Sequence, residues 1–303
     1  MVVPVVSVRE VEVPVRTPYR LDLTAVVLRR LSTNAVDTFD GTTYRRLLGA
    51  PAAPTLLAVA QVAPDALRVR LEGPRVDDVD PAAVVRRMLG TDVSLAAFDV
   101  GARRVPWLAP LAAAARGVKP PRYPSLWETV VNSVVYQQVS LHAAGAILRR
   151  IIEHYAPAHE VGGVALRAFV PAEAILAADP PDLRALGLSI NKVVTLKGVA
   201  QAIAAGALDE AALAALPTPA LLSALVAHKG IGSWTAAVIA LRGFARLDVF
   251  PMNDSGAVAS LRALSGDPDL QPEPVIAALV PQQGMLYYHL LMARLAARGE
   301  ITL

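Results

Sequence analysis

The sequence predicts an α+β domain over residues 1–117, followed by an all-α helical bundle over residues 118–303. Apolar and polar residues alternate in Val5–Val15 and again in Ala66–Leu71, as expected of strands with one buried face. A segment rich in proline and basic residues, Gly117–Pro124, is typical of a linker or of the entry to a second domain. Beyond it, apolar residues recur at helical spacing and no strand pattern of similar quality appears, which predicts the bundle.

Helix boundaries follow from local signals. Asp80 and Pro81 predict the start of a helix through Ala82–Leu89, because aspartate accepts hydrogen bonds from free amides and proline suits the first turn. The helices expected in the second part cover Leu126–Tyr155, Pro171–Ala178, Asp182–Leu186, Lys192–Ala205, Glu210–Leu216, Pro219–Ala227, Ser233–Leu241, Ser255–Leu264, Pro272–Leu279 and Met285–Ala297.

Composition excludes several kinds of chemistry. The chain of 303 residues has no cysteine, which excludes disulfides, thiol nucleophiles and iron–sulfur clusters. Of its five histidines only His154 and His159 lie close together, and Pro157 stands between them, so a zinc site is not expected. We therefore expect neither a metal nor a cofactor.

Membrane association and secretion are not expected either. The longest uncharged stretch, Val275–Ala293, contains proline, glycine, two glutamines and a histidine, which a lipid-facing helix tolerates poorly. The amino terminus lacks the basic region and cleavage site of a signal peptide, so a cytoplasmic protein is expected. A net charge of +3 is compatible with a polyanionic partner but does not decide the matter.

The first candidate site is a helical hairpin within Leu221–Arg242, where two amphipathic helices are joined by Lys229-Gly230-Ile231-Gly232. Two glycines let the chain reverse tightly and present backbone N–H groups at the start of the second helix, which favours binding of a phosphate. Ile231 is expected to anchor the hairpin in the core. The alternative is a plain helical hairpin with a glycine cap.

The second candidate is Asp254, which follows a short β-like run that starts at Leu247 and ends at Pro251, and precedes a helix that begins near Ser255. In the simplest interpretation Asp254, or Asn253, only caps that helix. A carboxylate held at a helix N-terminus also stays ionised and can stabilise a positively charged sugar. The two roles are compatible.

The third candidate is the segment Tyr136–Ser140, which lies in an otherwise apolar helical run from Trp127 to Arg150. Two adjacent glutamines, Gln137 and Gln138, are unexpected where a helix faces a core. They either lie on the solvent side, which is the commoner position for glutamine, or one lines a cleft and the other points at a bound partner.

Taken in order, these segments resemble the helix-hairpin-helix glycosylase superfamily, and specifically its bacterial 3-methyladenine DNA glycosylase II branch. The resemblance is carried by YQQVS, by Leu176–Leu196, by the hairpin KGIGSWTA and by DVFPMND, and it extends from about Pro120 to the C-terminus. The first part of the chain is similar in length and pattern to the additional domain of that branch. The expected fold is thus an α+β domain followed by a helix-hairpin-helix glycosylase bundle.

The resemblance implies a role for each matched residue. Asp254 matches the essential aspartate, and Gly230, Gly232 and Thr235 match the hairpin that grips the DNA backbone. Lys229 replaces a usual proline, where it either contacts a phosphate or is a solvated charge.

A second set of matched residues faces the base. Gln137 matches a glutamine beside the base pocket, Gln138 the residue that wedges into the duplex, and Trp234 a pocket aromatic, with Tyr136 as a further candidate wall. Ser255 and Leu291 depart from the pattern at positions where aromatic residues are expected, which leaves the range of bases open.

The implied activity is the removal of an alkylated base of the 3-methyladenine type from double-stranded DNA by a monomeric enzyme that flips the nucleotide out. Members that also cut the backbone carry a lysine at the position of Trp234, and tryptophan cannot form a Schiff base. A glycosylase without lyase activity is therefore expected. The alternatives are a non-catalytic DNA-binding protein of this fold and an oxidised-purine glycosylase/lyase that uses Lys229 or Lys192 as its amine.

Overall fold

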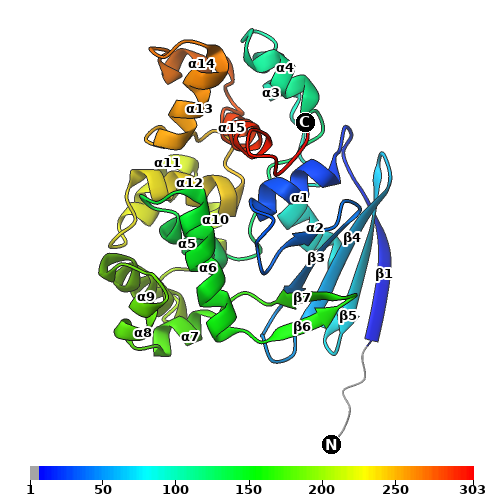
Figure 1. Cartoon of the computed structure of the whole chain (residues 1–303), viewed down its shortest axis with the longest axis vertical. Helices are drawn as coiled ribbons and strands as arrows, with labels where there is room; N and C mark the ends of the chain where they lie inside the picture. Colours follow the sequence, from blue (N-terminus) through cyan, green and yellow to red (C-terminus); the bar gives the residue numbers. More distant parts are fainter. Residues whose placement is uncertain (1–6) are drawn as a thin grey trace, which may run out of the picture.

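The computed structural model describes residues 7–303 and confirms an N-terminal sheet domain followed by a helical bundle (Figure 1). The first part contains β1 (Ser7–Pro14), α1 (Leu21–Arg29), β2 (Thr38–Phe39), β3 (Thr43–Leu48), β4 (Thr55–Ala63), β5 (Ala66–Gly73), a 3-10 turn η1 (Val76–Asp78) and α2 (Pro81–Leu89). Both predicted strands and the predicted helix are present, with Asp80 capping α2 as expected. Val5 and Val6 of the first predicted strand lie outside the described residues.

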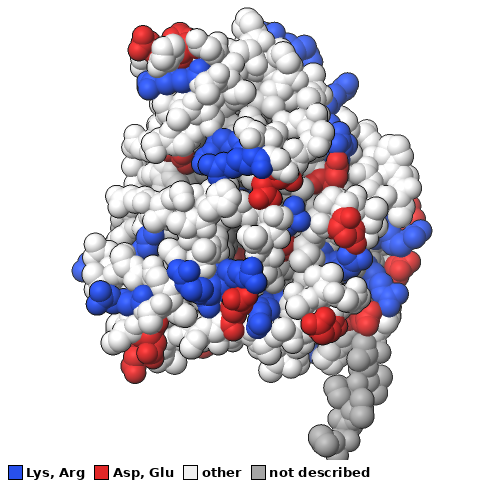
Figure 2. Space-filling model, viewed as in Figure 1, with Lys and Arg blue, Asp and Glu red and all other residues white. Residues whose placement is uncertain are grey.

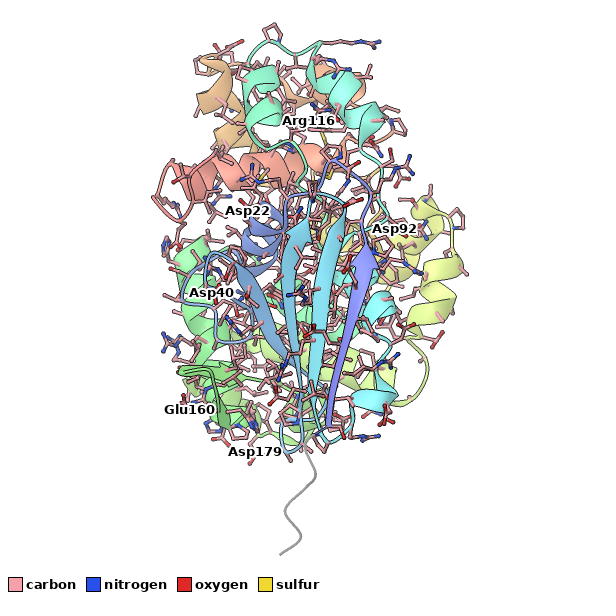
Figure 3. All side chains as sticks on the ribbon, turned by 90° about the vertical axis from the view of Figure 1, so that its right-hand side faces the viewer. Asp22, Asp40, Asp92, Arg116, Glu160 and Asp179 are labelled. Atoms are coloured by element: carbon pink, nitrogen blue, oxygen red, sulfur yellow. The ribbon has the colours of Figure 1, made fainter. Side chains whose placement is uncertain are left out.

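The five-stranded sheet is antiparallel throughout, in the order β1-β5-β4-β3-β2, and Figure 3 shows it face on. Leu57, Val59, Val69 and Leu71 are fully buried in the core that this sheet forms with α1 and α2. Burial of such β-branched and aliphatic side chains on one face explains the alternating pattern in the sequence.

The remaining elements are α3 (Ala96–Ala102), α4 (Leu108–Ala114), α5 (Leu126–Val135), α6 (Leu141–Tyr155), β6 (Ala158–Val161), β7 (Val164–Arg167), α7 (Ala172–Ala177), α8 (Pro180–Ala185), α9 (Ile190–Ala204), α10 (Glu210–Ala215), α11 (Thr218–Val226), α12 (Ser233–Phe244), α13 (Ser255–Ser265), α14 (Pro272–Ala278) and α15 (Gly284–Ala296). Among residues 7–303, no helix has the length and apolar character needed to cross a membrane.

The hairpin of β6 and β7 corrects the expectation that the second part contains no strands. Gly162 and Gly163 form a two-residue turn with φ of 57° and 79°, which is the glycine pair that tight hairpins favour. An isolated bridge between Leu47 and Ala168 places the hairpin beside β3 (Figure 3, near Glu160). The strands were missed because each has four residues and little alternation.

The helices form two separate hydrophobic cores. One contains residues of α5 to α12. In the other, Leu23, Val26 and Val27 of α1 pack with α3, α4, α13, α14 and α15, so the last helices of the chain return to the first. Figure 1 shows α15, in red, beside α1, in dark blue. The candidate site lies where these two cores meet.

Candidate active site

The segment Tyr136–Ser140 is a turn between two helices, which corrects the expectation of one helical run from Trp127 to Arg150. Helix α5 ends at Val135, and α6 begins after Ser140, whose hydroxyl accepts from the amide of Ala143 at 3.2 Å. Gln138 is exposed and has a φ of 54°, a left-handed conformation that is uncommon for any residue except glycine. A capping serine inside the apolar run is the sequence signal for this break.

A buried lysine holds this turn in place. The Lys192 ammonium donates to the carbonyl oxygens of Val135 and Gln137, both at 2.9 Å. These carbonyls lie at the end of α5, where no amide of the helix is left to bond them. Burial lowers the pKa of Lys192 from its ordinary value.

The helical hairpin between α11 and α12 has two glycines with different functions. Gly230 has a φ of +85°, and a Cβ at this position would overlap the Thr195 side chain, so only glycine fits. Gly232 has ordinary backbone angles and no other atom within 4 Å of the place a Cβ would occupy. It begins α12 without a side-chain cap, so the first amides of that helix face open space and can bind an anion. Ile231 is buried, as expected.

Gln137 joins the turn to the hairpin. Its side-chain amide donates to the Gly230 carbonyl at 3.0 Å and to the Thr235 hydroxyl at 2.8 Å. Thr235, expected on the DNA-facing hairpin, is buried and serves here as the acceptor for Gln137. Lys229 is exposed and lies outside the cleft lining.

Asp254 is the N-cap of α13, which agrees with the simplest expectation for this residue. One carboxylate oxygen accepts from the Ala257 amide at 2.8 Å and the other from the Trp234 indole N–H at 3.1 Å. The carboxylate is thus oriented from two sides while it remains partly exposed on a cleft.

The segment before Asp254 is not a strand, which corrects the β-like assignment of Leu247–Pro251. The Leu247 carbonyl accepts from the Gly284 amide at 2.7 Å, and the Asp248 carbonyl accepts from the Gln283 side chain at 2.6 Å. Because the start of α15 occupies these carbonyls, no neighbouring strand can form.

A cleft of about 910 Å³ opens between the two cores. Its lining includes Tyr136, Gln137, Gln138, Gly230, Gly232, Trp234, Thr235 and Asp254 from the expected set, together with Arg30, Lys192, Tyr287, Leu291 and Arg294. Three cationic side chains, Arg30, Lys192 and Arg294, line the cleft together with the Asp254 carboxylate. On the face seen in Figure 2, Lys and Arg side chains, in blue, are interspersed with Asp and Glu, in red. A concave surface with basic surroundings suits a polyanionic ligand.

Sequence reasoning did not identify Arg30 or Arg294 as cleft residues. Arg30 comes from the end of α1, about a hundred residues before the other contributors, and no local pattern separates it from the neighbouring Arg29. Burial, with the nearby Asp254 charge, raises the pKa of Tyr287 to about 12.

Comparisons with known proteins find matches for both parts of the chain. Residues 131–280 match the model of the HhH-GPD superfamily base excision DNA repair proteins, and residues 10–126 match the AlkA N-terminal domain. A probable bifunctional transcriptional activator/DNA repair enzyme AlkA of Mycobacterium tuberculosis is 31% identical over 253 residues, which is 80% of this chain and 48% of that protein.

Other relatives extend the comparison. A DNA-3-methyladenine glycosylase of Bacillus subtilis is 28% identical over 141 residues, 46% of each chain. The chain therefore spans about half the length of the curated relatives it matches. Among solved structures, a 3-methyladenine DNA glycosylase from Archaeoglobus fulgidus superposes with a TM-score of 0.76 at 19% identity, covering 94% of this chain and 98% of the other, which shows a shared fold.

Proposed function

Because the chain belongs to the HhH-GPD superfamily of base excision DNA repair proteins and carries the AlkA-type N-terminal domain, we propose that it is a DNA glycosylase. Its substrate is double-stranded DNA that contains alkylated bases of the 3-methyladenine type. The observation that carries this proposal is the Asp254 carboxylate, held by Trp234 and Ala257 at the edge of a cleft beside the amides of α12.

The geometry fits cleavage of an N-glycosidic bond. As the bond between C1′ and the base nitrogen breaks, its electron pair leaves with the base and positive charge develops on the sugar. A carboxylate at the position of Asp254 stabilises that charge, and water then adds to C1′ and releases a proton. A base alkylated at N3 or N7 is already cationic and leaves as a neutral molecule, so the reaction needs no strong general acid.

DNA is held without sequence readout in this proposal. The free amides at the start of α12 and the basic surroundings of the cleft bind phosphates. The damaged nucleotide rotates into the cleft, and Gln138, exposed on its left-handed turn, fills the gap left in the duplex. Trp234 stacks near the base, where an aromatic face favours a cation.

The enzyme releases the base and leaves the DNA backbone intact. A Schiff base requires a free amine beside C1′. By the sequence resemblance, Trp234 stands where lyases of this superfamily carry a lysine. Lys192 donates to two carbonyls, and Lys229 is exposed outside the cleft lining. Both walls of the cleft come from one chain, which supports a monomer, and genomic DNA as substrate supports a cytoplasmic location.

The test is chromatography of bases released from methylated genomic DNA by the purified protein. We expect 3-methyladenine in the soluble fraction and DNA that breaks only after alkali or an abasic endonuclease is added. DNA binding without release of any base would contradict the activity, and strand breaks from the protein alone would contradict the absence of lyase chemistry.

A further inference from the structure

Arg30 is a buried cation with unused hydrogen-bond donors at the cleft. It follows α1 with a positive φ of 66°, the residue is about 5% exposed, and it lines the cleft. Its guanidinium carbon lies 4.1 Å from the Tyr136 ring centroid. A guanidinium has five N–H donors, and the adjacent Tyr136 hydroxyl could accept only one of them. No carboxylate among residues 7–303 forms an ion pair with Arg30.

The other two buried arginines differ in this respect. Arg46 pairs with Asp37 at 2.9 Å and with Glu128 at 2.8 Å, and it ties the sheet to α5. Arg242 donates to the carbonyls of Val27 and Leu28 and lies over the Tyr123 ring. Arg46 has two carboxylate partners and Arg242 has two carbonyl partners, although each also keeps buried N–H groups without a partner. Of these three arginines, Arg30 is the one that lines the cleft.

Arg30, Tyr136 and Asp254 line the same cleft, together with Tyr287 and Arg294. An everted nucleotide with its sugar beside Asp254 would place its base toward Arg30 and Tyr136.

We propose that Arg30 is a specificity-determining residue that donates hydrogen bonds to a carbonyl oxygen of the everted base. This inference rests on the proposed glycosylase function. A buried guanidinium gains most from a ligand that supplies an acceptor, and it repels a cationic base that has none. Hypoxanthine is neutral and has a carbonyl, 7-methylguanine is cationic and has a carbonyl, and 3-methyladenine is cationic without one. Among the bases that the enzyme releases, Arg30 therefore raises the rate for those that bear a carbonyl relative to 3-methyladenine.

The test compares three proteins, the wild type, Arg30→Met and Arg29→Met, on two substrates. One is a duplex with a single hypoxanthine, and the other is methylated genomic DNA that releases both methylated purines. Arg29→Met is the matched control, because Arg29 is adjacent in sequence but donates to the Phe39 carbonyl at 3.2 Å. Single-turnover rates are measured for each base.

We expect Arg30→Met to slow hypoxanthine release by roughly tenfold to a hundredfold, the loss that follows from removing a charged hydrogen-bond donor. Release of 3-methyladenine stays the same or becomes faster, release of 7-methylguanine falls by less than that of hypoxanthine, and Arg29→Met changes no rate. If Arg30→Met does not fold, Arg30→Lys is used instead, because lysine keeps the charge but lacks the paired N–H donors of the guanidinium. In Arg30→Lys, the ratio of the hypoxanthine rate to the 3-methyladenine rate should fall several-fold.

Three results would overturn the inference while the wild type still releases 3-methyladenine: no hypoxanthine release, an unchanged ratio in both Arg30 variants, or equal losses on every base. The last would assign Arg30 to phosphate binding or to the fold. A wild type that releases no base at all would contradict the proposed function itself.

Discussion

The two walls of the cleft differ in how many of their polar groups already have partners. On the hairpin wall, formed by Tyr136–Ser140, the start of α9 and the start of α12, Gln137 and Lys192 each donate two hydrogen bonds within the protein. The arginine wall is formed by Arg30, Tyr287 and Arg294. None of these three side chains donates a hydrogen bond of normal geometry to an acceptor within residues 7–303.

This difference separates two tasks. The hairpin wall uses its polar side chains to fix backbone geometry, and in the proposed function the amides of α12 bind phosphate. The proposed contact to the base comes from the arginine wall. Asp254 joins the two walls, since it caps α13 beside the arginine wall and accepts from Trp234 of the hairpin wall.

The largest expected effect follows from Asp254→Asn at the junction of the walls. Asparagine caps a helix as well as aspartate does, so the fold should remain. Loss of the charge should slow base release by about a thousandfold, comparable to losses at other electrostatic catalytic groups. Excision kinetics on methylated DNA measure this, with Asp269→Asn, an exposed residue, as control. Near-normal rates of base release in Asp254→Asn would show that Asp254 has no catalytic role.

On the hairpin wall, Lys192→Met should weaken the fold. The carbonyls of Val135 and Gln137 would lose their donor inside the protein, which costs about 1–3 kcal/mol of unfolding free energy. Lys192→Arg should restore part of the loss. Urea unfolding measures both variants, and borohydride trapping with wild-type protein should give no covalent DNA adduct. A trapped adduct that disappears in Lys192→Met would mean that this amine acts in catalysis.

On the arginine wall, low pH should reduce the stability of the packing around α15, the helix that carries Tyr287 and Arg294. Burial lowers the pKa of His289 to about 4, and its Nδ1 lies 2.8 Å from the Met285 carbonyl oxygen. The folded state favours neutral His289. The contribution of His289 to the free energy of unfolding is therefore complete above pH 6.5 and is lost as the pH falls toward 4. By pH 5 the loss reaches about 2 kcal/mol of unfolding free energy.

Urea unfolding at pH 7.5 and pH 5 tests this dependence. His289→Phe keeps a ring against Phe98, with which His289 packs at 4.5 Å between centroids, but it cannot titrate. The variant should lose less stability than the wild type over the same pH interval. Identical losses would show that His289 is not the group responsible.

The smallest expected effect concerns Gly232→Ala. Its backbone angles suit alanine and the space is open, so the unfolding free energy should change by less than about 0.5 kcal/mol. The added methyl group lies in front of the α12 amides and should weaken DNA binding by about tenfold. Gly198→Ala, also in open space but in α9, is the control. Unchanged DNA affinity in Gly232→Ala would show that the start of α12 does not contact DNA.

The sequence predicted elements whose signals are local. The Asp80 and Asp254 caps and the burial of Ile231 follow from residues within one turn of helix, and each is present. The break at Tyr136–Ser140 depends on the Ser140 cap and on Lys192, which is more than fifty residues away in the sequence. Helical periodicity alone does not show this break, so the predicted helix ran through it.

The arginine wall could not be predicted from local pattern. Arg29 and Arg30 have the same chemistry and adjacent positions, and only the packing of α1 against α15 decides which one enters the cleft. The roles of the matched residues toward DNA remain predictions that the variants above test.

The return of the last helices to α1 has a consequence for synthesis on the ribosome. A nascent chain can form the helical hairpin before α15 emerges, but the pocket acquires Tyr287 only with one of the final segments. The cleft of an incomplete polypeptide would then lack part of one wall, because a contact between distant parts of the chain forms late.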